Sequence, residues 1–176
     1  MNELMQTNFN TLFYVTVSVV VRIDIFRRKE YIDIVMRDLQ FCQKNKGLNI
    51  YGYVIMTNPF HLIALQQQNQ LNKILGHFKS FSSKEILKVI EEDVNEKRQE
   101  WLLYMFRYHA KYKAGFDEYH LWDGDNNSVR LHSRESALEK LHFMHENPVR
   151  AGFVEKPEQW LLSSANPNSP VQVLPI

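Results

Sequence analysis

The chain lacks the features that would assign it to a disulfide-rich or membrane class. It contains one cysteine, Cys42, so an intramolecular disulfide framework is excluded and a reducing cytoplasm fits best. The apolar stretch from Phe13 to Ile23 is too short to span a bilayer, and Arg22 and Asp24 interrupt its end. No segment has the pattern of a signal peptide or membrane anchor, and we find no internal repeat. We therefore expect a cytoplasmic protein with no membrane partner.

Charge of neither sign is in excess. The 21 Lys and Arg residues are balanced by 20 Asp and Glu residues, which gives a formal net charge of +1. This balance neither requires nor excludes a polyanionic partner, because the clustering of charge matters more than its sum for nucleic-acid binding.

The length and composition are those of an ordinary globular protein. A chain of 176 residues with 44% hydrophobic and 23% charged residues can bury a substantial core. We expect one domain over residues 1–165. The last residues, 166–176, contain three prolines and scattered polar side chains, which predicts a loosely ordered tail.

The first part of the chain changes its hydrophobic period several times. β-Branched and aromatic residues predict strands, and apolar residues at three- and four-residue spacing predict an amphipathic helix that stops at Gly47. A short break at Thr57–Pro59 predicts that the strands on either side of it are antiparallel. The expected elements are a strand over Leu12–Asp24, a helix over Lys29–Lys46, and strands over Leu48–Met56 and Phe60–Gln66.

The second part of the chain is mainly helical in pattern. One helix is expected to cover Leu71–Phe78, and Ser82 with Glu85 has the spacing of a capping box that would begin another. A further helix is expected over Asn95–Tyr112. Its aromatic residues, Trp101, Tyr104 and Tyr108, are expected to belong to the core rather than to a base-stacking platform.

The remaining segments complete an α+β pattern. Residues Lys113–Ser128 predict loops around a short strand, Tyr119–Trp122. Ser133 is expected to cap a last helix that ends near Asn147–Pro148, because a residue before proline avoids helical geometry. The order β-α-β-β followed by helices predicts an antiparallel sheet with helices packed on it.

Separated sequence blocks carry a family resemblance. They are Phe13–Val17, Tyr31 with Cys42–Leu48, Tyr51–Asn58, Phe78–Lys84, His145–Gly152, and Pro157–Glu158 with Ser163–Ala165. In these blocks, over about residues 10–165, the chain resembles the REP-associated tyrosine transposases and their insertion-sequence relatives, single-tyrosine members of the HUH superfamily of single-stranded DNA endonucleases. The resemblance implies a ferredoxin-like antiparallel sheet with packed helices.

Two motifs of that family are incomplete here. The family has two histidines that flank a hydrophobic residue, so that both lie on one face of a strand and bind a divalent cation (Mg or Mn); this chain has Pro59 in the first position and His61 in the second. The family helix carries a tyrosine that attacks DNA and, one turn later, a polar metal ligand. The matching residues are Phe143 and Asn147.

These departures have different consequences. Phe143 has no hydroxyl group and cannot form a phosphotyrosine, which blocks covalent cleavage of the family type. Pro59 removes a nitrogen ligand, which leaves His61 and Asn147 as a poor set for a cation. His142 or His145 could supply another ligand, although a structural or surface role is the favoured interpretation. The other tyrosines considered as nucleophiles are expected to pack instead: Tyr104, Tyr108, Tyr112 and Tyr119.

The resemblance also implies recognition of single-stranded or hairpin DNA. Lys79 and Lys84 flank Ser82 and Ser83, where a helix is expected to begin, and backbone N–H groups at a helix start can hold phosphate. This is the preferred phosphate contact. Each cation could equally be a solvated surface charge. The full set of candidate phosphate contacts adds Arg27, Arg28, Lys29 and Arg150.

Three functions follow from these observations. The first is a transposase-family protein that binds DNA but has lost phosphotyrosine-forming cleavage. The second is an active transposase or nuclease in which a metal-activated water replaces the tyrosine. The third is a protein-interaction module, or a relic, that no longer binds DNA. Family members occur as monomers and as homodimers, and the sequence does not decide between these states.

Overall fold

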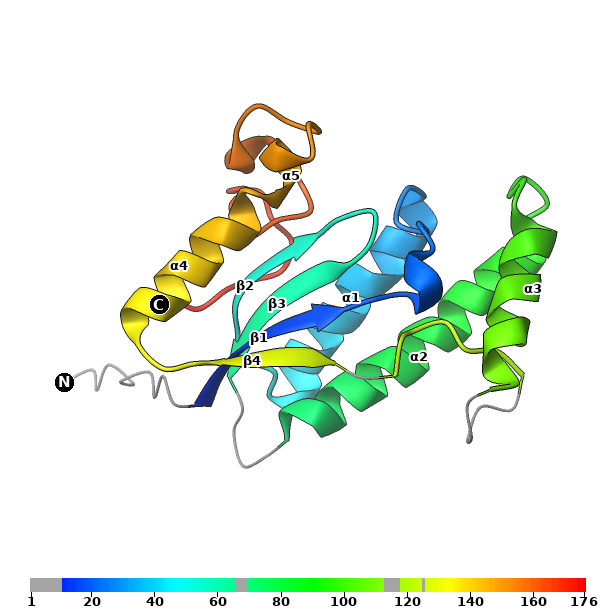
Figure 1. Ribbon diagram of the computed structural model, residues 1–176, viewed down its shortest axis with the longest axis horizontal. Helices are drawn as coiled ribbons and strands as arrows, with labels where there is room; N and C mark the ends of the chain where they lie inside the picture. The colour runs from blue at the N-terminus through cyan, green and yellow to red at the C-terminus, as the bar shows by residue number, and fades with distance from the viewer. Residues whose placement is uncertain (1–10, 66–69, 113–117, 125) are drawn as a thin grey trace.

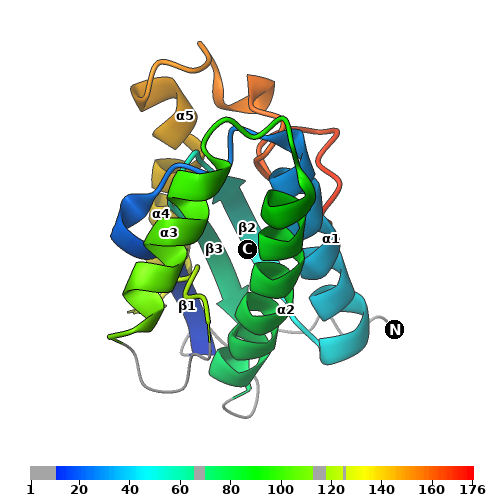
Figure 2. The ribbon, with the colours of Figure 1, turned by 90° about the vertical axis from the view of Figure 1, so that its right-hand side faces the viewer.

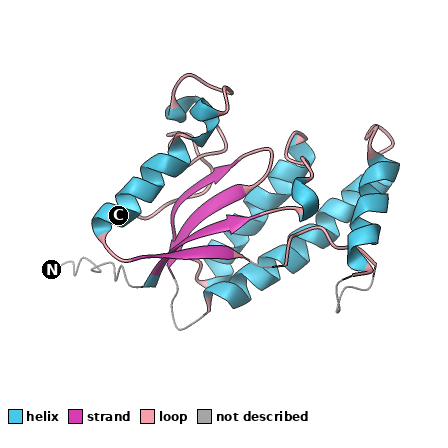
Figure 3. Ribbon diagram, viewed as in Figure 1, coloured by secondary structure: helices cyan, strands magenta, loops and turns pink. Residues whose placement is uncertain are grey.

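A computed structural model describes residues 11–65, 70–112, 118–124 and 126–176. Four antiparallel strands form one sheet in the order β2-β3-β1-β4, with helices around it (Figures 1 and 3). Among the described residues, no helix combines the length and apolar character of a membrane span. The strands are β1 (Leu12–Val17), β2 (Ile50–Ile55), β3 (Phe60–Leu65) and β4 (Asn127–Leu131); the helices are α1 (Lys29–Lys46), α2 (Leu71–Glu92), α3 (Gln99–Ala110), α4 (Arg134–His145) and α5 (Asn147–Arg150), with short 3-10 turns at Val20–Arg22 and Pro157–Gln159.

The sheet is covered on both faces. Helices α1 and α2 pack on one face and α4 on the other, while α3 lies beyond the end of the strands, beside α2 (Figures 1 and 2). The order β1-α1-β2-β3-α2-β4, with β3 and β4 each antiparallel to β1, is a ferredoxin-like α+β arrangement. The expected fold class is confirmed.

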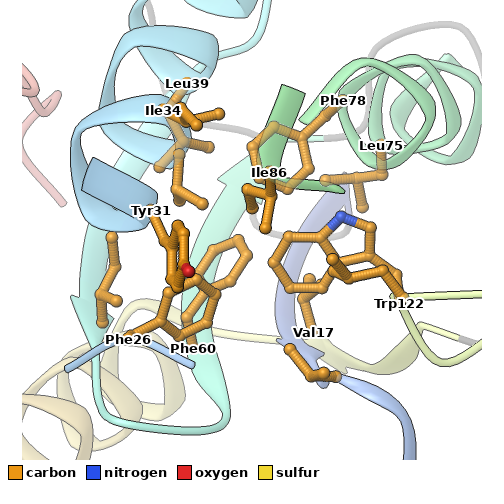
Figure 4. Close-up of a cluster of buried hydrophobic side chains, with 14 of the residues drawn as sticks. Val17, Phe26, Tyr31, Ile34, Leu39, Phe60, Leu75, Phe78, Ile86 and Trp122 are labelled. Atoms are coloured by element: carbon orange, nitrogen blue, oxygen red, sulfur yellow. The ribbon is translucent and has the colours of Figure 1, made fainter. Parts of the chain in front are cut away.

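Alternation along the strands sends side chains into two separate cores. Val17 and Phe60 point toward α1 and α2, where aromatic residues such as Trp122 fill the space between the helices (Figure 4). Tyr14 and Ile63 point the other way, toward Met144 of α4. The smaller of these cores therefore fixes α4 on the sheet.

Several local predictions are confirmed. Helix α1 has the expected bounds, and Gly47 ends it in the left-handed conformation with φ of 71°. Strands β2 and β3 form the expected antiparallel hairpin. The Ser133 side chain accepts a hydrogen bond from the Ser136 N–H at the start of α4, as expected for an N-cap.

Other boundaries differ from the prediction. Strand β1 ends at Val17 rather than Asp24, and Val21 and Arg22, with positive φ angles of 43° and 54°, form a turn within the remaining expected strand. The expected strand Tyr119–Trp122 forms only an isolated bridge between Trp122 and Val19. Strand β4 was not predicted, since its sequence NSVRL is mostly exposed and has little hydrophobic alternation.

The predicted helix start at Ser82 is wrong. Helix α2 continues through this residue, and the Ser82 hydroxyl lies buried in its interior. It donates to the Phe78 carbonyl oxygen at 2.7 Å and accepts from Trp122 Nε1 at 2.9 Å. The Ser-x-x-Glu spacing of a capping box is also compatible with a continuous helix, and here burial against the indole decides the outcome.

The predicted core role of the α3 aromatics is also wrong. The side chains of Trp101, Tyr104 and Tyr108 are 48%, 62% and 42% exposed. Leu102 and Phe106 form the buried face instead. Both sets of residues recur at helical spacing, so the period alone could not identify the inward face.

The end of the chain follows the outer edge of β2. Leu162 O accepts from Ile55 N at 2.8 Å, and Leu174 N donates to Ile50 O at 2.8 Å. The Val171 side chain is buried in the main core. Within residues 166–176, the pairing of Leu174 with Ile50 satisfies backbone groups of the strand edge, a contact that composition does not reveal.

Candidate functional site

Helix α4 lies directly on the sheet because β2 contains a glycine. A Cβ atom on Gly52 would lie 2.3 Å from Cδ1 of Leu141 and 2.8 Å from Cε of Met144, so the close approach depends on the missing side chain. Phe143 projects from the same helix and is 48% exposed. The position that the resemblance assigns to the nucleophile is therefore open to solvent, but carries no hydroxyl group.

His61 lies on the sheet face that α4 covers. It pairs in register with Thr16 of β1, and His61 Nδ1 lies 3.1 Å from Thr16 Oγ1. Its ring stacks on Tyr14, with centroids 5.4 Å apart. Burial lowers the pKa of His61 to about 4, so its imidazole is neutral at physiological pH.

Two cations lie against the neighbouring aromatic rings. Lys140 Nζ is 5.6 Å from the Tyr14 ring centroid and 5.4 Å from that of Phe143. Arg150 Cζ lies 4.2 Å from the Phe143 centroid, a favourable cation–π distance. These contacts join His61 on β3 to α4 through shared rings.

Arg150 also bonds to Asn147. Arg150 Nη2 donates hydrogen bonds to the Phe143 carbonyl oxygen, at 2.8 Å, and to Asn147 Oδ1. The amide oxygen that the resemblance assigns to a metal thus accepts from a guanidinium. We call this cluster the α4 site, and define it as Tyr14, His61, Lys140, Phe143, Asn147 and Arg150.

The residues of the α4 site do not fit a divalent cation. Pro59, in the turn between β2 and β3, has no side-chain donor, and its peptide bond with Asn58 is cis. Asn147 Oδ1 accepts a hydrogen bond from Arg150, and a second cation, Lys140, lies against the Phe143 ring of the same site. In the part of the chain that the structure describes, no three His, Cys, Asp or Glu side chains are grouped to hold a metal.

The two histidines considered as substitute metal ligands, His142 and His145, are not part of the α4 site. His145 Nε2 lies 2.8 Å from Ser164 Oγ, which joins α4 to the C-terminal segment. Burial lowers the pKa of His145 to about 4, and the neighbouring His142 acts in the same direction. His142 itself is exposed. The geometry supports a structural role for His145.

The basic residues at the start of α1 are paired with acids. Arg27 bonds to Asp24, and Lys29 to Asp33. Arg28 Nη2 lies 2.5 Å from Asp93 Oδ2, and its other nitrogens are near Glu30 and Glu96. Helix α1 is also on the face of the sheet opposite α4 (Figures 1 and 2). The structure does not bring these three cations together with Arg150.

Lys79, Ser83 and Lys84 line a groove of about 710 Å³ between α2 and residues 118–124. Ser82 is buried beneath it. Lys79 Nζ donates to the Asp123 carbonyl oxygen at 2.7 Å. Because α2 is continuous here, its backbone N–H groups are engaged within the helix, and the expected helix-start phosphate cradle is not formed.

The other tyrosines lie away from α4. Tyr104 and Tyr108 are on α3, and Tyr112 follows that helix. The Tyr119 hydroxyl lies 2.6 Å from Arg107 Nη2 and donates to Glu91 Oε1 at 3.0 Å. Tyr119 is thus held by an ionic network, while the tyrosines of α3 are exposed rather than packed.

The sequence prediction missed Lys140 and Tyr14. Lys140 is three residues before Phe143, so helical spacing could have placed the two side chains together. Tyr14 joins the site through the register of β1 with β3, which brings it beside His61. No local pattern specifies that register.

Comparison with known proteins gives a likeness of fold. No protein-family model matches the chain, and no curated protein matches its sequence. Among solved structures, it is similar to a REP-associated tyrosine transposase bound to a REP hairpin, with a TM-score of 0.61 and 13% sequence identity. The match covers 88% of this chain and 76% of that one. At this identity the likeness shows the shared α+β fold.

Proposed function

We propose that this protein is a transposase-like DNA-binding protein of the HUH type that holds single-stranded or hairpin DNA at the α4 site without forming a phosphotyrosine. The observation that carries the proposal is the pair of cations, Lys140 and Arg150, against the exposed ring of Phe143. The fold supports it, because the similar transposase was solved with a DNA hairpin. Homodimer formation is left open, and a cytoplasmic location accords with the single buried Cys42.

The α4 site is suited to a phosphodiester anion. A guanidinium and an ammonium group can each contact a phosphate oxygen through charge-assisted hydrogen bonds. The neighbouring His61 is neutral, so the positive charge of the site comes from Lys140 and Arg150. DNA held in this way is bound by its backbone, with an affinity that falls as salt rises.

The chemistry of the site opposes covalent cleavage. Phe143 has no nucleophilic atom, and the tyrosine in the site, Tyr14, is on β1 with a buried ring. Burial raises the pKa of Tyr14 to about 12, although the charge of Arg150 partly opposes this effect. Its buried phenol is therefore harder to deprotonate than that of an ordinary tyrosine, which makes it a poor nucleophile. The guanidinium of Arg150, which donates to Asn147, also argues against the metal-dependent nuclease.

Fluorescence anisotropy tests the proposal. Labelled hairpin, linear single-stranded and duplex DNA are titrated with the protein across a salt series, with and without manganese. We expect binding selective for hairpin or single strands, weakened by salt and independent of manganese. Denaturing gels of the same mixtures should show no covalent protein–DNA adduct.

Each contrary result has a defined meaning. No binding to any DNA at low salt would remove the proposal and favour a protein-interaction module or a relic. A manganese requirement with strand cleavage would favour the metal-dependent nuclease. A covalent adduct would show that a side chain elsewhere than at Phe143 attacks DNA and would overturn the proposed loss of covalent cleavage.

A further inference from the structure

Helix α3 and the turn that follows it present a row of aromatic side chains to solvent. We call Trp101, Tyr104, Tyr108 and Tyr112 the α3 stripe; they are 48%, 62%, 42% and 72% exposed. The Tyr104 and Tyr108 rings are nearly parallel, with centroids 6.2 Å apart, and the Tyr108 and Tyr112 centroids are 5.2 Å apart. The rings therefore form one surface rather than isolated contacts.

Packing of α3 does not account for the stripe. The buried face of the helix is formed by Leu102, Phe106 and Ala110, which recur every fourth residue. The stripe lies on a different side of the helix and contributes little to the core. Single exposed aromatics are normal in soluble proteins, but a contiguous group marks a surface that binds something.

The stripe leads to a cavity at the end of the sheet. His109 and Tyr112 form one side of this cavity of about 570 Å³, and Thr16 and Asn127 form another. Thr16 is bonded to His61, which belongs to the α4 site. Thr16 therefore lies between the cavity, which it lines, and His61 of the α4 site, which it contacts. A long, flexible ligand held at the α4 site could extend past Thr16 to the cavity.

The charges around the cavity end of the stripe favour an anionic polymer. Arg22 lines the cavity and is exposed, and Lys111 is exposed beside Tyr112. Asp123 is the acidic residue in the cavity wall, and its Oδ1 accepts from the Gly124 N–H at 2.9 Å. Glu100 lies at the opposite end of α3. Phosphate groups would meet two cations where the stripe reaches the cavity.

We propose that the α3 stripe is a base-stacking platform for single-stranded DNA that continues from the α4 site. Unpaired bases expose their faces to aromatic side chains, whereas bases within a duplex are stacked on one another. The stripe binds without regard to sequence, because every base has an aromatic face. This inference rests on the proposed DNA binding at the α4 site and adds a second, tail-binding surface to it.

Hairpins with and without a single-stranded tail test the inference. Binding of the full chain is measured for one hairpin alone and for the same hairpin with roughly ten thymidines at either end, a length within the range of known single-strand sites. The test variant is Tyr104→Leu/Tyr108→Leu/Tyr112→Leu. The matched control is Tyr104→Phe/Tyr108→Phe/Tyr112→Phe, which keeps the rings. Because these residues are exposed, both variants should keep the wild-type melting temperature.

We expect the Leu variant to lose only the extra affinity that the single-stranded DNA tail provides. Wild type and the Phe control should bind a tailed hairpin more tightly than the bare one, and the Leu variant should not. Each lost stacking contact should weaken tailed-hairpin binding by roughly 5- to 150-fold. Binding of the bare hairpin should be equal in all three proteins. Thymidines replaced by 5-iodouracil should photo-crosslink to α3 in the wild type.

Other outcomes separate this inference from the proposed function. If the bare hairpin binds but a tail adds nothing in the wild type, the platform is wrong and the proposed function stands. Failure of every DNA to bind refutes both. Sedimentation of the three proteins tests whether a second copy of the chain, rather than DNA, covers the α3 stripe. If the Leu variant converts a dimer to a monomer with unchanged tail binding, the stripe is a subunit interface and the platform is refuted.

Discussion

Replacing Lys140 and Arg150, the two cations of the α4 site, should remove DNA phosphate contacts whose number can be read from the salt dependence of binding. The perturbations are Lys140→Ala, Arg150→Ala and the double variant. Lys140 and Arg150 lie 5.4 Å and 4.2 Å from the centroid of one ring, Phe143, so both can reach phosphates of the same strand. Neither has an acidic partner among the ion pairs of the described residues, so no carboxylate has to be displaced when DNA binds.

The magnitude follows from counterion release. Each phosphate contact contributes about 0.7 to the slope of log affinity against log salt for single strands. Each single variant should therefore lower the slope by about 0.7, and the double variant by about 1.4. Loss of a charge-assisted contact should also cost about 1.5–3 kcal/mol of binding free energy. Arg150→Lys should keep the slope but bind more weakly, because an ammonium group lacks the forked donors of a guanidinium and cannot keep both hydrogen bonds from Nη2 to Phe143 and Asn147.

The assay is anisotropy with single-stranded and hairpin DNA across a salt series. Lys44→Ala is the matched control, because Lys44 is an exposed cation on α1, on the opposite face of the sheet. It should bind like the wild type. Thermal unfolding should change little in any variant, since the substituted side chains are at the surface. If the double variant binds DNA with the wild-type slope, phosphate is held elsewhere and the reasoning about the α4 site fails.

Three further predictions concern stability and chemistry. Ser82→Ala should lower the free energy of unfolding by about 1–3 kcal/mol, because the buried Trp122 N–H loses its acceptor; an unchanged urea midpoint would contradict this. Phe143→Tyr should give no covalent DNA adduct on denaturing gels, because the metal donors of the α4 site are still missing. An adduct would show that the missing hydroxyl group at position 143 was the only defect of the site. Burial lowers the pKa of His61 and His145 to about 4, below the unfolded value of about 6.5. The unfolded state then binds more protons, so stability should be complete above about pH 6.5 and fall toward pH 4; a flat profile of urea midpoints would refute this.

The parts of the fold that the sequence predicted are those that local chemistry determines. Helix α1 has a regular apolar period and a glycine stop, and its bounds were predicted to the residue. The Ser133 cap is a local hydrogen bond. Strand β4 was missed because it is formed by pairing with β1, which supplies the hydrogen bonds that its own exposed sequence does not indicate.

The candidate site was predicted only in outline. The resemblance identified Phe143, Asn147 and Arg150, which lie within about two turns of one helical region and are brought together locally. Lys79 and Lys84 were placed at a helix start that does not exist, because burial of Ser82 against an indole depends on a residue forty positions away. Long-range packing of this kind has no signature in a single sequence.

The pairing of the C-terminal segment with β2 also determines at which edge the sheet could accept a strand from another molecule. Of its two edge strands, β2 already accepts and donates hydrogen bonds along its outer side, to Leu162 and Leu174. Among the described residues, no segment pairs with the outer side of β4, which is short and carries Arg130, a charge that disfavours pairing with another strand. Any strand from another molecule that extended the sheet would therefore add beside β4, next to the strand that carries Tyr14 and Thr16.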